Sequence, residues 1–325
     1  MPKFVRRLQR IGSSILVSLP KDWILENHLE KNIEVELETS PDSVLITTNK
    51  GRRPLKEVII SYPLPKEENI VADITGAYLL GYDMIKIESK FNIPIRDRDN
   101  IRNSMRRLVG MEIVEEDAST ITMQFLLDTA SLNPQKILKR TSTIVLGMFN
   151  DVYTSLISKD KSNLQTLPSR DVEVNRQYFL LVRLVRSIMI DPRLSKTFHL
   201  ENIDVLDYRL ASNLLEGSAD TIVELAEILY SKSIPEQDLK KIYDVAKDFE
   251  LMEQKAIDAF IKNDRRLAID AISLHKKNQT RITSLMSTIR NKTQIPIDFL
   301  DVVYMFDRVE KSWADVADLI KPLYD

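Results

Sequence analysis

The residues whose type and spacing most clearly suggest a binding function are the basic ones at the start of the chain. The first 21 residues contain five Lys and Arg side chains and no Asp or Glu, and the acidic residues begin only at Asp22. Because cationic side chains on one face of a small unit can bind backbone phosphates, this one-sided basic front points to contact with DNA. The five residues are Lys3, Arg6, Arg7, Arg10 and Lys21.

Catalytic chemistry has little support in the sequence. The three histidines, His28, His199 and His275, fall on separate predicted elements. The chain contains no HExxH zinc motif, no phosphate-binding P-loop, no GxSxG nucleophile motif and no dinucleotide-binding glycine pattern. It also has no cysteine, which excludes disulfides, thiolate metal sites and cysteine nucleophiles. We therefore expect a protein that is not an enzyme.

Length and charge limit where DNA could bind. The chain has 325 residues and a formal net charge of -2, so it is long for one core and is not basic overall. Two or three domains are expected, and any contact with DNA must be local. No apolar run approaches the ~20 residues needed to cross a bilayer, and the first residues lack the apolar core of a signal peptide. We expect a cytoplasmic protein.

The first 50 residues predict a compact, strand-rich unit that would position the basic residues. A unit of this size made of short strands buries too little apolar surface to be stable alone, so we expect it to interlock with a second copy. In its short helix, Trp23, Ile24 and His28 can face inward. The predicted elements are strands at residues 4–8, 15–19, 33–37 and 44–48, a turn at 12–14 and a helix at 21–29.

The run RRLQRIGSSILVSLPKDW, followed by an acidic and apolar strand, resembles the SpoVT/AbrB-type swapped-hairpin domain. Many members have Gly-Asp before that strand, whereas this chain has Lys31 and Asn32; Asn also tolerates the turn conformation. The resemblance implies an interlocked homodimer that presents the five basic residues to DNA. The alternative is that this domain only dimerises and its arginines are solvated.

The middle of the chain predicts a small α/β domain over residues 55–130, after a linker at 51–54. Arg98, Arg102 and Arg106 recur at steps of four on its second helix and form one basic stripe. A solvated face, partly paired with Asp97 and Asp99, is favoured over an anion or partner site. The predicted elements are strands at 57–62, 84–87, 112–114 and 121–126, and helices at 67–80 and 97–109.

The rest of the chain, residues 134–325, predicts an all-α region. Only Gly217 follows Gly147, and prolines separate six helix-forming segments. These divide into two three-helix repeats, 134–231 and 235–321, which align when Glu216 is placed on Glu310. The segments are 134–160, 169–190, 202–231, 236–262, 264–293 and 297–320.

The helical region resembles PhoU, a family of tandem three-helix bundles associated with control of phosphate uptake. The resemblance rests on DVEVNRQYFLLVRLVRSIMIDP and LDYRLASNLLEGSADTIVELAEIL. Together with the AbrB-type domain, it implies a DNA-binding transcriptional regulator of phosphate homeostasis whose helical half senses a signal or partner. The alternative is an adaptor that negatively regulates a phosphate ABC transporter, or docks on a signalling protein, and uses its N-terminal domain only to dimerise.

The PhoU resemblance also implies a metal site, because such bundles often bind metal ions through carboxylates at E-x-x-x-D spacing. Glu216 and Asp220 keep this spacing, and Asp171 and Glu173 lie on the preceding helix in the region that would oppose them. The ion would be divalent Mg, Mn, Fe or Zn. An ordinary polar helix face is the competing interpretation, since three residues depart from the family pattern: Asn175, Asn278 and Ala314.

Overall fold

The computed structural model describes residues 4–40, 43–48, 55–65, 69–291 and 293–320. The chain divides into two compact units, Met1–Pro54 (unit 1) and Leu55–Asp325 (unit 2). Unit 1 is rich in strands and unit 2 is mostly helical, as the mixed fold class predicted. Lys3, one of the predicted DNA contacts, and the predicted linker at 51–54 lie outside the described residues.

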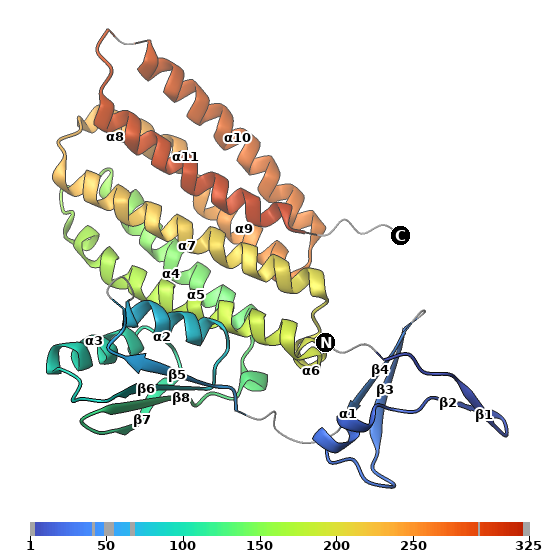
Figure 1. The fold of residues 1–325 in the computed structure, drawn as a ribbon. Helices are drawn as coiled ribbons and strands as arrows, with labels where there is room; N and C mark the ends of the chain where they lie inside the picture. Colours follow the sequence, from blue (N-terminus) through green and yellow to red (C-terminus); the bar gives the residue numbers. More distant parts are fainter. Residues whose placement is uncertain (1–3, 41–42, 49–54, 66–68, 292, 321–325) are drawn as a thin grey trace. The chain divides into compact units, whose positions relative to one another are not determined.

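Unit 1 consists of two antiparallel hairpins and one short helix (Figure 1). The first hairpin turns at Gly12, whose φ of +63° is a conformation that favours glycine. The prediction of a strand at residues 4–8 is wrong, because the hairpin at this turn pairs only three residues on each side, and its first strand starts at Gln9. Asn32 has a φ of +69°, as the turn before the next strand requires. The elements are β1 (Gln9–Ile11), β2 (Ser14–Leu16), α1 (Lys21–Glu26), β3 (Val35–Ser40) and β4 (Ser43–Thr48).

Unit 2 begins with a mixed four-stranded sheet of order β5-β6-β8-β7, in which β5 and β6 are parallel. The alternation in β6 buries Ile85 and Ile87, and β8 adds Ile121 and Met123 to the same core. Figure 1 shows α2 and α3 above the sheet. The elements are β5 (Glu57–Tyr62), α2 (Ile70–Leu79), β6 (Met84–Ser89), α3 (Ile95–Met105), β7 (Met111–Glu116) and β8 (Thr120–Phe125).

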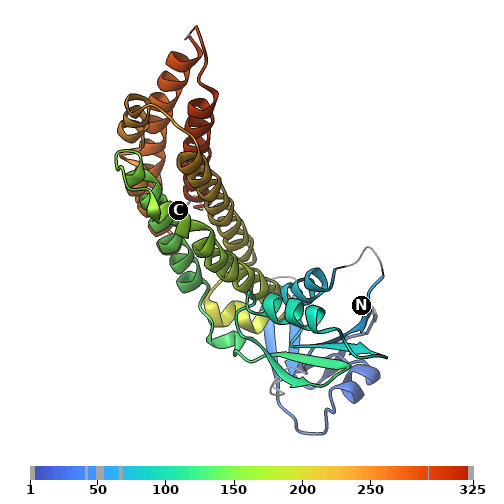
Figure 2. The same ribbon diagram turned by 90° about the vertical axis from the view of Figure 1, so that its left-hand side faces the viewer.

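The remainder of unit 2 is a stack of long helices that run side by side (Figure 2). Among the described residues, none of these helices is long and apolar enough to cross a membrane. They are α4 (Pro134–Ser155), α5 (Leu167–Ile190), α6 (Pro192–Phe198), α7 (Asn202–Ser231), α8 (Glu236–Ala246), α9 (Phe249–Lys262), α10 (Arg265–Arg290) and α11 (Ile297–Asp318), with 3-10 turns at Thr129–Ser131 and Ser162–Thr166.

Two features of these helices differ from the prediction. The helix expected over 236–262 is broken at Asp248, whose carboxylate accepts hydrogen bonds from Lys277 (3.0 Å) and Arg281 (2.8 Å) of α10. The short helix α6 was not predicted. It begins at Pro192, and Asp191 caps its N-terminus: the Asp191 side chain accepts a hydrogen bond from the Arg193 backbone N–H. Both features depend on single side chains that the apolar pattern does not reveal.

The helices pack as two groups that share one core. Helices α4, α5 and α7 pack together, as do α9, α10 and α11, and α7 lies along α11. An aromatic cluster joins the groups: the Phe149 ring lies 5.0 Å from Trp313 and 5.8 Å from Phe306, both in edge-on geometry. The Trp313 indole N–H also donates to the Ser218 hydroxyl at 3.1 Å. The groups are therefore held in one compact body.

Candidate functional site

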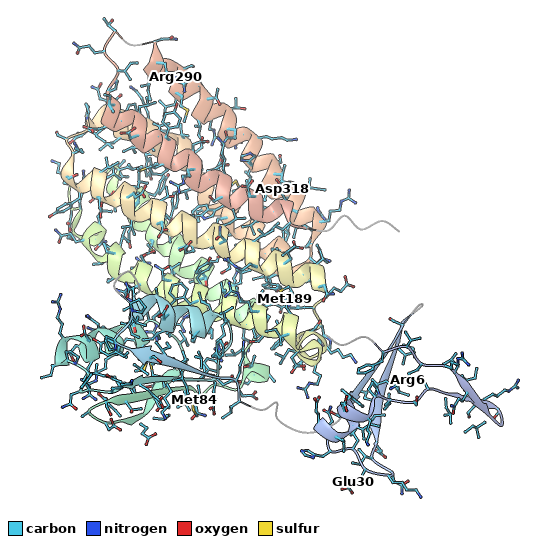
Figure 3. The ribbon with its side chains drawn as sticks, in the orientation of Figure 1. Arg6, Glu30, Met84, Met189, Arg290 and Asp318 are labelled. Atoms are coloured by element: carbon cyan, nitrogen blue, oxygen red, sulfur yellow. The ribbon has the colours of Figure 1, made fainter. Side chains whose placement is uncertain are left out.

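The described basic residues of the N-terminal front, Arg6, Arg7, Arg10 and Lys21, are all exposed (Figure 3). Arg10 lies on β1 and its Nε donates to the Gly12 carbonyl at 3.3 Å. The Arg6 guanidinium lies 5.7 Å from the Phe4 ring centroid. Within the described residues, no ion pair neutralises any of the four. Their charges are therefore available to an anionic partner.

Unit 1 lacks a buried core of its own. None of its described side chains is buried, and Val5 and Leu8 are 87% and 71% exposed. Ile15 and Leu37, one from each hairpin, are at least 60% exposed. Trp23 and Ile24 of α1 are half-buried, whereas His28, which lies beyond the end of α1, is exposed. Only the first two therefore turn partly inward as expected. The single chain thus leaves apolar surface on both hairpins in water.

Three of the four predicted metal-site acids come together between α5 and α7. Burial, with the charge of Asp220 next, raises the pKa of Asp171. Burial and the charges of Asp220 and Asp171 likewise raise the pKa of Glu216. The charges of neighbouring acids thus act on both Asp171 and Glu216, in addition to burial. Glu173 lies outside this group, because it accepts hydrogen bonds from Arg140 (2.9 Å) and Gln177 (2.8 Å).

The fit of this acid group to a metal ion is incomplete. One oxygen of Asp171, Oδ1, is buried without a hydrogen-bond partner among the described residues, as a ligand oxygen would be. The other oxygen accepts from Asn175 at 2.9 Å, which stands where the family pattern has an acid. Across the described parts of the chain, no three His, Asp or Glu side chains are arranged to hold a metal ion. A divalent ion at Glu216 and Asp220 therefore stays a prediction.

The corresponding position of the second repeat, Glu310, is fully buried and is surrounded by hydrogen-bond donors. His275 Nδ1 lies 2.9 Å from its Oε2, and the amide groups of Asn278 and Gln279 donate at 3.1 and 2.8 Å. Burial raises the pKa of Glu310, and these donors oppose the increase. Gln279 also donates to Asp307 at 2.8 Å. Side-chain N–H groups, which cannot bind a cation, thus occupy both oxygens of this carboxylate.

Two buried ionisable groups escaped the sequence analysis. Glu253 of α9 is 1% exposed and accepts a hydrogen bond from the Ser142 hydroxyl of α4 at 2.6 Å. Arg183 of α5 donates to the Tyr78 and Tyr82 carbonyls, both at 2.8 Å, and stacks 3.9 Å from the Phe125 ring centroid. The hydrogen bonds join residues 101 to 111 positions apart, so no local spacing could have indicated them.

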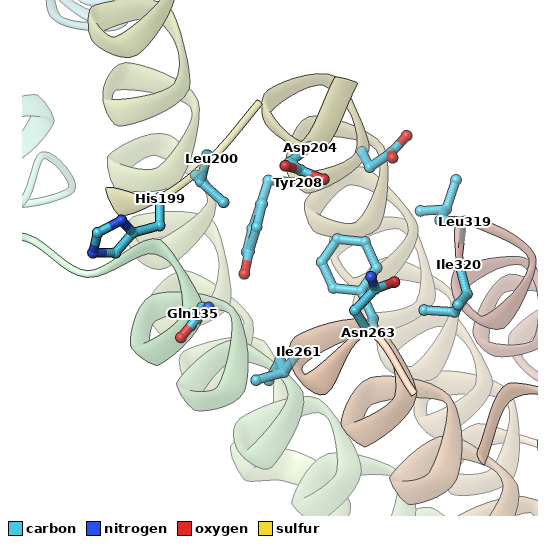
Figure 4. Close-up of a pocket in the computed structure, with 11 residues that line it drawn as sticks. Gln135, His199, Leu200, Asp204, Tyr208, Ile261, Asn263, Leu319 and Ile320 are labelled. Atoms are coloured by element: carbon cyan, nitrogen blue, oxygen red, sulfur yellow. The ribbon is translucent and has the colours of Figure 1, made fainter. Parts of the chain in front are cut away.

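A cavity of about 190 Å³ opens where the ends of several helices meet in unit 2 (Figure 4). His199, Asp204 and Tyr208 line it from the start of α7 and the turn before it, and Asn263 and Ile320 line the opposite side. No Lys or Arg is among its described lining residues.

Comparison with known proteins identifies one part of the chain. Residues 138–229, from α4 to α7, match the model of the PhoU domain. The PhoU resemblance is thereby confirmed for this span, which contains Asp171, Glu216 and Asp220. A crystal structure of PhoU from Pseudomonas aeruginosa is similar at 16% identity and a TM-score of 0.45, over 57% of this chain and 93% of that protein. No match to the chain is found among curated proteins.

Proposed function

We propose that this protein is a DNA-binding transcriptional regulator of phosphate homeostasis that acts as a homodimer. Its PhoU domain at residues 138–229 is the observation that carries the link to phosphate, through the role associated with PhoU proteins. Unit 1 is a separate compact unit, as a DNA-binding domain joined to a sensing domain would be. In this proposal, the helical part responds to a signal or a partner protein and unit 1 contacts the operator.

Dimerisation through unit 1 is supported by its exposed apolar surface. Val5, Leu8, Ile15 and Leu37 would each remove apolar area from water if the hairpins of two copies interlocked. A second copy would supply the core that one chain lacks, which is the AbrB-type arrangement. Light scattering should therefore show a dimer for the full chain, and Ile15→Asp with Leu37→Asp should shift it to monomer. The exposed pair Ile190→Asp with Ile297→Asp, in unit 2, is the matched control.

The four described cations support DNA contact, because they are exposed and unneutralised within the described residues. Each phosphate contact contributes a slope of about −0.9 to the dependence of log K on log salt. Changing Arg6, Arg7 and Arg10 to Ala removes three cations per chain and six per dimer, so the slope should become shallower by about 5. Fluorescence anisotropy with promoter DNA over a salt series measures this change.

The control for the DNA experiment is a triple variant that removes equal charge elsewhere, Arg265→Ala, Arg266→Ala and Lys276→Ala on the exposed face of α10. It should leave the slope unchanged. An unaltered slope in the Arg6, Arg7 and Arg10 variant would show that this face does not bind DNA. In that case the adaptor becomes the better function: unit 1 would dimerise the chain, and PhoU-type docking on a phosphate transporter or signalling protein would be its role.

A divalent ion at Asp171, Glu216 and Asp220 remains part of the proposal. Burial is the main cause of the raised pKa values of Asp171 and Glu216, and the charges of neighbouring carboxylates add to it; a bound cation would offset both effects. Elemental analysis of protein purified without chelator should find stoichiometric Mg, Mn, Fe or Zn, and Glu216→Gln should abolish it. Absence of metal in the parent protein would exclude the ion without affecting the DNA experiment.

A further inference from the structure

The outer face of α3 combines exposed cations with two exposed apolar side chains. Phe91, in the connection that leads into α3, is 76% exposed, and Ile95, the first residue of the helix, is 79% exposed. The opposite side of the helix buries Ile101 and Ser104 in unit 2. The "α3 face" is defined here by Lys90, Phe91, Ile95, Arg96, Arg106 and Arg107, all of them exposed.

The α3 face shares Arg106 with the basic stripe predicted from the sequence, but the other two arginines of that stripe have acidic partners. Arg98 and Arg102 both bind Glu116, with their Nη2 atoms 3.0 and 2.9 Å from the same carboxylate oxygen. Arg102 also lies 3.4 Å from Asp99. These two arginines therefore reinforce the sheet edge, and their charge is compensated.

The remaining cations have no such compensation. Within the described residues, no ion pair engages Lys90, Arg96, Arg106 or Arg107. Four charges therefore face outward along one side of a single short helix and its leading connection.

We propose that the α3 face docks on an anionic lipid bilayer. Surfaces that lie in the membrane interface combine Lys and Arg with protruding Phe, Leu or Ile, because the cations meet anionic headgroups while the apolar groups enter the acyl boundary. Phe91 and Ile95 are each next in sequence to an exposed cation, Lys90 and Arg96 respectively, which is the combination that such a surface needs. DNA would give large exposed apolar side chains no such partner, so the apolar pair favours a lipid surface.

Cosedimentation with vesicles tests the proposal. Vesicles of phosphatidylcholine containing phosphatidylserine should bind the protein, and vesicles of phosphatidylcholine alone should not. Replacing Phe91 and Ile95 by Ser should each weaken binding at least about tenfold. Replacing Arg106 and Arg107 by Ala should weaken it about fivefold each, since a cation near an anionic surface contributes about 1 kcal/mol.

Two controls make the result specific to this face. All proteins carry Arg6→Ala, Arg7→Ala and Arg10→Ala, so the three arginines proposed to contact DNA cannot account for vesicle binding, and failure of the DNA proposal leaves the vesicle result interpretable. Met189→Ser with Ile297→Ser removes two exposed apolar side chains elsewhere in unit 2 and should leave binding unchanged. The proposal is overturned if the protein ignores anionic vesicles. It is also overturned if the Phe91 and Ile95 variants bind normally, which would indicate a purely electrostatic surface for an acidic protein.

Discussion

The buried carboxyl group of Glu253 should make the stability of unit 2 depend on pH. Burial raises its pKa from 4.5 to about 7, and the Ser142 hydrogen bond and the charge of Lys139 only partly oppose this. Its second oxygen, Oε2, has no hydrogen-bond partner among the described residues. Folding therefore favours the protonated acid, whereas the unfolded chain ionises near its ordinary pKa.

The sign and size of the effect follow from this difference. Because the folded state binds the proton more tightly, stability is greatest below the unfolded pKa and is lost as pH rises toward the folded one. A shift from 4.5 to about 7 lowers the free energy of unfolding by roughly 2 to 3 kcal/mol between pH 5 and pH 8. Glu253→Gln mimics the protonated acid, so the free energy of unfolding of this variant should not show that decrease with pH.

Urea unfolding of the parent protein and of Glu253→Gln across that pH range measures the effect. Trp313 is 1% exposed in the shared core and reports the unfolding of unit 2 when the other tryptophan, Trp23, is replaced by Phe. Glu250→Gln, an exposed neighbour on α9, is the matched control and should follow the parent. If the parent and Glu253→Gln show parallel pH profiles, Glu253 ionises normally and the reasoning from its burial is refuted.

Three further predictions concern the packing of unit 2, and each is measured by urea unfolding. Arg183→Ala should lower the free energy of unfolding by about 3 kcal/mol or more, because it removes a buried cation that donates to two carbonyls and to Asp83. The control, Arg107→Ala at an exposed position, should lower it by almost nothing, and equal stabilities of the two variants would contradict this. Gly110→Ala should destabilise unit 2 by about 2 kcal/mol, because Gly110 has a φ of +78° and an added Cβ would lie 2.7 Å from Leu127. Gly76 lies on α2, where an added Cβ would meet open space, so Gly76→Ala should stabilise unit 2 by up to about 1 kcal/mol. The reverse order would show that neither backbone argument holds. Glu310→Ala should lower the free energy of unfolding by about 3 kcal/mol, because it leaves the side chains of His275, Asn278 and Gln279 without their shared partner. The control, Glu227→Ala at an exposed position, should change stability little. An unchanged stability of the Glu310 variant would mean that water replaces the carboxylate.

Much of the secondary structure could be predicted because it depends on local periodicity. Alternation placed β6 and β8, and apolar steps of three and four placed α4, α7 and α11. The break at Asp248 could not be predicted, because its partners Lys277 and Arg281 lie on the next helix. The strand expected at residues 4–8 was wrong because hairpin register depends on the turn at Gly12 as well as on apolar residues.

The candidate sites divide in the same way. Four-residue spacing puts Glu216 and Asp220 on one helix face, and Asp171 was expected on the preceding helix in the region that opposes them; their role as metal ligands stays a prediction. Glu173 was included with them, but it lies two residues from Asp171, or about 200° around a helix, and Arg140 holds it elsewhere. The α3 face differs from the predicted stripe because Glu116, on a strand, neutralises Arg98 and Arg102.

Composition, charge pattern and periodicity indicated a strand-rich basic unit followed by a helical region, and the PhoU-like character of that region came from its resemblance to the family. These features are local, since charge and apolar pattern belong to consecutive residues. The state of each ionisable group was decided only by tertiary structure. Burial raises the pKa of Glu253, side chains of α10 form hydrogen bonds with Glu310, and Arg183 forms an ion pair with Asp83. Desolvation and pairing depend on neighbours that are distant in sequence, so the printed order of residues does not reveal them.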